Sequence, residues 1–121
     1  MDILLVLESF MLVSGLTKEE AERWLPLCHW AAASVYGRLR SDVDVIAHRA
    51  AVCYAAGVTA YYKYVLRNAA QNGSSRFSVG DVTVSENVND GVKAAKALYD
   101  EAMASVEHLF GDGFAFMGVV T

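Results

Sequence analysis

The sequence predicts a mainly α-helical fold, a bundle of four to five helices with a short β-hairpin or an extended loop between the last two. Apolar residues recur at helical spacing over long stretches, helix-capping patterns precede several of these stretches, and the 121 residues include 1 proline. We expect helices over residues 2–13, 17–40, 42–68 and 88–110 and a hairpin over residues 77–85. A chain of this length suits one domain, covering residues 1–121.

The first two expected helices are bounded by recognisable signals. Apolar residues at spacings of three and four mark the first helix, at Ile3, Leu4, Leu7, Phe10 and Met11. Gly15 favours the end of this helix. Thr17 and Glu20 form a capping-box pattern at the start of the second helix. Pro26 is expected to bend or restart that helix, because proline lacks an amide hydrogen.

The third expected helix is the centre of the bundle. Asp42 and Asp44 favour a helix start, because short acidic side chains cap free amides. The stretch AAVCYAAGVTAYYKYVL, residues 50–66, is apolar on nearly every face, as in a helix that other elements surround. Small residues such as Gly57 would let neighbouring backbones approach closely.

The last third of the chain carries a turn signal and a final helix. Gly80 and Asp81 suit a two-residue turn inside the apolar segment FSVGDVTVSE. Asn87 and Asp90 mark the next helix start, and a stripe from Val88 to Leu109 predicts an amphipathic helix. The apolar tail FAFMGVVT is expected to dock against something, because chain ends are usually polar and loose.

The composition limits the classes of function. The net charge of −4 disfavours a protein whose main task is to neutralise nucleic-acid phosphates, although an acidic surface can face passing DNA without gripping it. Hydrophobic residues make up 55% of the chain, so part of the apolar surface is expected to meet copies of the chain or a partner. We expect no secretory signal and no membrane span.

No pattern predicts a catalytic, cofactor or metal site. His29, His48 and His108 lack metal-binding spacing, and Cys28 and Cys53 are interpreted as buried thiols in a reduced setting. Cys28 and His29 are adjacent on a helix, so their side chains point about 100° apart and cannot act as a nucleophile and its base.

Two further clusters have an ordinary explanation and a functional alternative. The acids Asp42 and Asp44 are interpreted as a helix cap in preference to a general acid and base. The glycine turns at residues 80–81 and 111–113 lack the lysine of phosphate-binding loops. Basic residues of the second and third helices could form a phosphate-contacting strip or a solvated face: Arg38, Arg40, Arg49, Lys63 and Arg67.

The order of features resembles the small head–tail connector proteins of long-tailed phages and prophages. The resemblance rests on the central helix AAVCYAAGVTAYYKYVL, the segment FSVGDVTVSEN after a polar loop, and the last helix KAAKALYDEAMASVEHL. It covers roughly residues 41–117. It implies a helical bundle whose subunits form a ring beneath the portal, through which the genome passes.

The resemblance implies a structural virion protein at the virion neck, located in the host cytoplasm during assembly. Its expected partners are copies of itself, the portal and the tail-completion proteins, with DNA only as non-specific cargo. We expect no enzyme activity, no cofactor and no metal. The residues expected to contact neighbouring subunits are Phe77, Val79, Val82, Val84, Phe114, Phe116 and Met117.

Two other classes of function remain open from the sequence. A small intracellular regulatory or DNA-binding module would need a basic face built from Arg38, Arg49 and Arg67, and its DNA affinity would depend on salt. An enzyme with a site assembled from distant residues would show a deep pocket holding an acid or a histidine with a shifted pKa.

Overall fold

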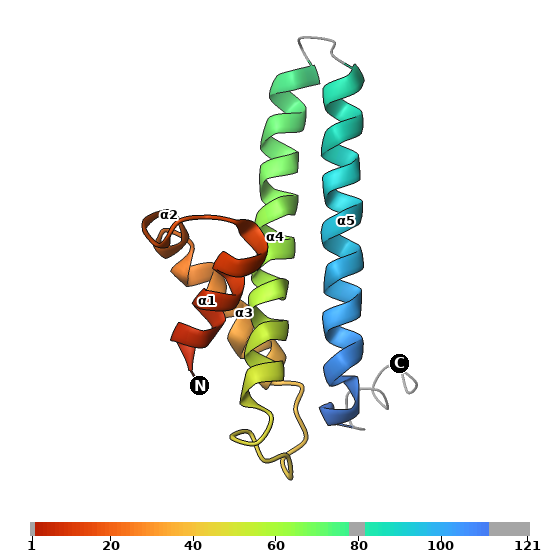
Figure 1. The fold of residues 1–121 in the computed structure, drawn as a ribbon. Helices are drawn as coiled ribbons and strands as arrows, with labels where there is room; N and C mark the ends of the chain where they lie inside the picture. Colours follow the sequence, from red (N-terminus) through yellow and green to blue (C-terminus); the bar gives the residue numbers. More distant parts are fainter. Residues whose placement is uncertain (1, 78–81, 112–121) are drawn as a thin grey trace.

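The computed structural model describes residues 2–77 and 82–111, with residues 72–77 and 82–89 described by their backbone. This part of the chain is mainly helical, as the sequence predicts (Figure 1). Its elements are α1 (Ile3–Ser14), α2 (Lys18–Glu22), α3 (Leu25–Tyr36), α4 (Arg49–Phe77), α5 (Val82–Val106) and the 3-10 turn η1 (Glu107–Leu109).

Helix α4 is the centre of the fold, as its apolar sequence predicts. Helices α1 and α3 pack on the first half of α4, and α5 runs antiparallel to α4 along its length (Figure 1). The second half of α4 and the first half of α5 extend past the α1–α3 cluster as a two-helix arm.

The first helices begin and end where the capping signals predict. The Asp2 carboxylate accepts a hydrogen bond from the Leu5 amide at 3.3 Å, and Gly15, with a φ of 75°, ends α1. Thr17 and Glu20 complete the capping box at the start of α2: the Thr17 hydroxyl accepts from the Glu20 amide, and the Glu20 carboxylate accepts from the Thr17 amide.

The single helix expected over residues 17–40 is corrected to two. Helix α2 ends at Glu22 and α3 begins at Leu25, with Arg23 and Trp24 between them. Pro26 lies in the first turn of α3, where its missing amide hydrogen costs nothing. The expected restart at this proline is confirmed, whereas the end of α3 at Tyr36 precedes the expected end at residue 40.

The third helix begins later than its acidic residues predict. Helix α4 starts at Arg49 and not at residue 42, and it continues to Phe77 instead of ending near residue 68. The Asp44 carboxylate accepts from the amides of Ile46 and Ala47 at 3.1 and 3.2 Å, so this acid caps a turn that precedes the helix. Short polar side chains stabilise turns and helix starts by the same bonds, and the sequence alone does not separate the two.

The last helix begins before its expected start at residue 88. Helix α5 starts at Val82, so Asn87 lies inside it and residues 82–85 are helical, where the second strand of a hairpin was expected. Residues 78–81, with the expected turn, lie outside the described residues. Strand propensity is a weak preference that tertiary context overrides, and here residues 82–85 continue the long helix that pairs with α4.

The core lies where α1, α3 and α5 meet α4. Its largest fully buried side chains are Phe10, Val6, Val35, Val52, Val58, Val106, Cys28 and Cys53. Helices α1 and α4 approach most closely at Gly57, where an added Cβ atom would lie 2.8 Å from the Phe10 amide nitrogen. The expected close approach at this glycine is therefore confirmed.

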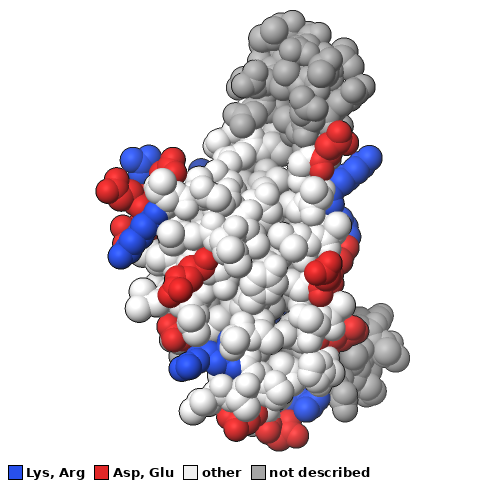
Figure 2. All heavy atoms as spheres, viewed as in Figure 1, with Lys and Arg blue, Asp and Glu red and all other residues white. Residues whose placement is uncertain are grey.

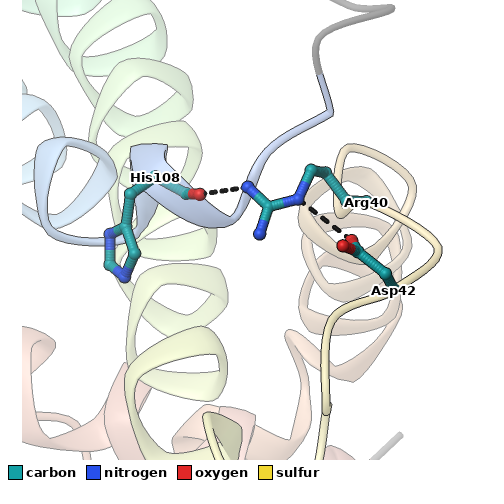
Figure 3. A network of polar contacts seen from close by, with 3 residues as sticks. All are labelled: Arg40, Asp42 and His108. Atoms are coloured by element: carbon teal, nitrogen blue, oxygen red, sulfur yellow. Dashed lines mark hydrogen bonds and ion pairs between the residues drawn. The ribbon is translucent and has the colours of Figure 1, made fainter.

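A short polar latch joins the segment after α3 to the segment after α5. Leu39 and Phe110 form an isolated antiparallel β-bridge, and the Gly111 amide donates to the Arg38 carbonyl at 2.8 Å. The Arg40 guanidinium donates to the His108 carbonyl and, at 3.0 Å, to the Asp42 carboxylate (Figure 3). This latch fixes the C-terminal end of α5 against the rest of the bundle.

Candidate functional site

A basic aromatic groove lies between the start of α3 and the middle of α4. It has a volume of about 460 Å³ and opens to solvent. Its lining residues are Arg23, Trp24, Pro26, Leu27, Trp30, Lys63 and Arg67. We call this surface the α3/α4 groove.

Each tryptophan of the groove forms a cation–π contact with a basic side chain of α4. The Lys63 ammonium lies 5.5 Å from the ring centre of Trp30, and the Arg67 guanidinium lies 5.9 Å from that of Trp24. Tyr64 meets Trp24 edge to face, with ring centres 4.8 Å apart. These contacts hold the two cations at the rim of an apolar surface, since a ring face attracts positive charge.

The α3/α4 groove has an excess of positive charge. Among the described residues, none of Arg23, Lys63 and Arg67 forms a salt bridge with a carboxylate. The nearby Glu20 carboxylate is held by Thr17: hydrogen bonds from Thr17, and then the charge of Arg23, lower the pKa of Glu20. The groove therefore offers three cations next to apolar side chains, an arrangement that suits an anionic group attached to an apolar one.

The structure divides the expected basic strip among three places. Lys63 and Arg67 come together in the α3/α4 groove. Arg38 lies over the ring of Phe110 at 6.0 Å, and Arg40 binds Asp42 in the latch. Arg49 lines a second, smaller hollow with Asp2, Tyr36, Val45 and Ile46.

Sequence reasoning missed the aromatic half of the groove. The apolar spacing of the second expected helix predicts a buried Trp24, yet this side chain is half-buried and lines the groove. Trp30 is 47% exposed, which its apolar character alone does not predict. The available signal was the four-residue spacing of Lys63 and Arg67, which places both cations on one face of a helix.

The side chains of Cys28 and His29 lie in different surroundings, as their adjacent positions on a helix predict. Cys28 is buried and His29 is exposed, and burial raises the pKa of the Cys28 thiol from 9.0 to about 11, so this thiol stays protonated well above neutral pH. His48 and His108 lie with ring centres 6.3 Å apart, an approach that sequence reasoning did not foresee. Within the part of the chain that the structure describes, three or more potential metal ligands do not gather anywhere.

Several large apolar side chains remain in solvent on the outside of the bundle. Leu4 and Leu12 of α1 are 66% and 76% exposed, and Ile46 is 79% exposed. Glu8, the one charged residue of α1, is exposed between the two leucines. In the view of Figure 2, a broad uncharged surface crosses the middle of the molecule, and most charged side chains lie towards its edges.

None of the residues expected to contact other subunits has a described side chain. Phe77 is the last residue of α4, and Val82 and Val84 belong to the first turn of α5. Val79, Phe114, Phe116 and Met117 lie outside the described residues. The backbone of Phe77, Val82 and Val84 lies at the far end of the two-helix arm, where α4 ends and α5 begins (Figure 1).

The chain matches no family model, no curated protein and no solved structure. None of the helices in residues 2–77 and 82–111 combines the length and apolar character that crossing a bilayer requires.

Proposed function

We propose that this protein is a structural adaptor, a head–tail connector subunit that assembles into a ring between the portal and the tail of a long-tailed phage. The observation that carries the proposal is the set of large apolar side chains that the folded subunit leaves exposed, at Leu4, Leu12, Trp30 and Ile46. Exposed apolar surface of this kind is typical of sites that bind other proteins. The resemblance of residues 41–117 to phage connectors supplies the biological setting.

The two-helix arm gives the adaptor a second contact surface. Its far end carries Phe77 and Val82 on either side of residues 78–81, within the apolar segment that the sequence assigns to subunit contacts. We propose that the arm reaches a neighbouring subunit, and that the tail residues Phe114, Phe116 and Met117 add to the contact. DNA would pass through the ring as non-specific cargo.

Localisation in assembled particles tests the adaptor function. Particles of a phage or prophage that encodes this chain are imaged by cryo-electron microscopy, and their proteins are identified by mass spectrometry. We expect the chain as a ring at the neck, between portal and tail. Particles that contain no copy of the chain, or that hold it in the capsid shell or tail fibres, would contradict the proposal.

A DNA-retention measurement separates the adaptor from a DNA-binding module. The adaptor is expected to retain little duplex DNA at 50 mM salt, because its net charge is −4. A DNA-binding module would bind at this salt concentration and lose roughly 10³-fold or more in affinity by 200 mM.

A further inference from the structure

We infer that the α3/α4 groove binds the exposed face of α1 from a second copy of the chain. This inference rests on the proposed adaptor function, and it names the partner of the groove. The face of α1 consists of Leu4, Glu8 and Leu12, and we call it the α1 stripe. All three side chains are exposed and recur every four residues, so they form one row along the helix.

The α1 stripe and the α3/α4 groove are complementary in charge. Glu8 is exposed and forms no salt bridge among the described residues. Lys63 and Arg67 at the groove are also exposed and without a carboxylate partner there. A carboxylate that reaches these two cations would form charge-assisted hydrogen bonds at the edge of an apolar contact.

Both surfaces also carry apolar side chains beside their charged groups. Leu4 and Leu12 are separated by about 12 Å along α1, with Glu8 midway, from the rise of about 1.5 Å per residue. Lys63 and Arg67 lie one helical turn apart. A carboxylate between two leucines can therefore face this pair of cations while the leucines contact the apolar lining formed by Pro26, Leu27 and the tryptophans.

A nucleic-acid base fits the groove less well than a helix. Bases bind such sites by stacking on open aromatic faces. In the groove, Lys63 already lies over Trp30, while Arg67 and Tyr64 contact Trp24. These contacts favour an occupant that uses the cations and the apolar edges rather than the ring faces.

The contact would be heterologous, because the stripe and the groove are different surfaces of one chain. Head-to-tail repetition of such a contact closes into a ring when the rotation between copies allows it. The stripe has only three residues, and three side chains bury less area than the ~800 Å² per partner of a standard interface. We therefore expect a weak contact between isolated copies, strengthened when other contacts close the ring.

Site-specific cross-linking of the full chain tests the inference. One variant carries Leu12→Cys and a second carries Pro26→Cys, which places a thiol in the groove and keeps both tryptophans. The variants are mixed and treated with a short bismaleimide, and the mixed dimer is measured by mass spectrometry. In the control pair, Ala104→Cys on the exposed side of α5 replaces Pro26→Cys. The natural cysteines, Cys28 and Cys53, are buried, so we expect the bismaleimide to react with the introduced thiols.

We expect the groove pair to cross-link about five-fold or more above the control pair, the effect of roughly 1 kcal/mol of preferred contact. Lys63→Glu with Arg67→Glu in the groove protein should reduce the yield to that of the control. Adding Glu8→Arg to the stripe protein should restore it. Circular dichroism checks that each variant is folded, and raising the salt to 1 M should lower the yield without any charge substitution.

Three outcomes would overturn the inference. The first is an equal cross-linking yield for the groove pair and the control pair. The second is a yield that neither charge reversal nor salt changes. The third is tight binding of an oligothymidylate to the natural chain, with binding lost in the Lys63→Glu, Arg67→Glu variant. The last outcome would assign the groove to nucleic acid. In each case, a ring of the chain at the particle neck would leave the adaptor function standing, so the two proposals fail separately.

Discussion

A Cβ atom on Gly57 would lie 2.5 Å from the Cβ atom of Ser9, well inside the normal contact distance. Gly57 is in the first half of α4 and Ser9 is in α1, so the two helices touch backbone to side chain at this point. The absence of a side chain at residue 57 therefore sets the distance between α1 and the centre of the bundle.

Gly57→Ala is expected to destabilise the protein by about 1–3 kcal/mol, because α1 must move away from α4 to make room for the methyl group. The matched control is Gly91→Ala in α5, where an added Cβ meets nothing within 4 Å. The control should stabilise the protein by about 0.5–1 kcal/mol, since alanine is the better helix former. Urea unfolding measures both, and equal effects of the two substitutions would contradict the close contact at Gly57.

The latch at the end of α5 depends on Arg40, which binds both the His108 carbonyl and the Asp42 carboxylate. Arg40→Ala is expected to cost about 1 kcal/mol of stability and to speed hydrogen exchange at the Gly111 amide, which donates to the Arg38 carbonyl. Asp42→Asn is the control, because it removes the ion pair and leaves the bond to His108. If Asp42→Asn speeds hydrogen exchange at the Gly111 amide as much as Arg40→Ala does, the ion pair stabilises the latch, and the bond to the His108 carbonyl does not.

Alkaline pH should weaken the fold through Cys28. Burial raises the pKa of this thiol from 9.0 to about 11, so the unfolded chain loses the proton at lower pH than the folded chain does. The stabilising contribution is complete below pH 9 and is lost as the pH rises to about 11, with a magnitude of the order of 2 kcal/mol.

Cys28→Ala should reduce the decline in the free energy of unfolding between pH 9 and 11. A decline from about pH 10 to pH 12 should remain, because burial and the hydrogen bond with Cys53 raise the pKa of Tyr36 from 10.0 to about 12. Urea unfolding at several pH values measures both steps. A decline between pH 9 and 11 that is as steep in Cys28→Ala as in the natural chain would show that another group is responsible.

The sequence predicts elements of this fold better than it predicts their ends. The capping box at Thr17 and Glu20 and the helix end at Gly15 were predictable, because each is a local bond pattern with a strong residue preference. The start of α4 at Arg49 was not, since Asp44 caps a turn with the same bonds that it would use to cap a helix. Residues 82–85 are helical as part of α5, which pairs with α4. Residue propensities describe single residues and carry no information about contacts with another helix.

The α3/α4 groove was predictable only in part, for a related reason. The spacing of Lys63 and Arg67 indicates that they share a face of α4, but their position over Trp30 and Trp24 depends on how α3 crosses that face. An apolar pattern alone assigns Trp24 to the core, because it does not show which apolar residues lie at the edge of a helix contact.

Helix α1 has a core side and a solvent side, and substitutions on the two sides should differ sharply. Phe10 is fully buried and meets Tyr64 edge to face at 5.7 Å, so Phe10→Ala is expected to cost about 3–5 kcal/mol. Leu12, two residues later, is 76% exposed, and Leu12→Ala should change stability by less than about 0.5 kcal/mol. Thermal unfolding at low protein concentration, where association is negligible, measures both values. A cost above about 1 kcal/mol for Leu12→Ala would show that Leu12 supports the subunit itself, and its exposure would then no longer support a role in subunit contacts.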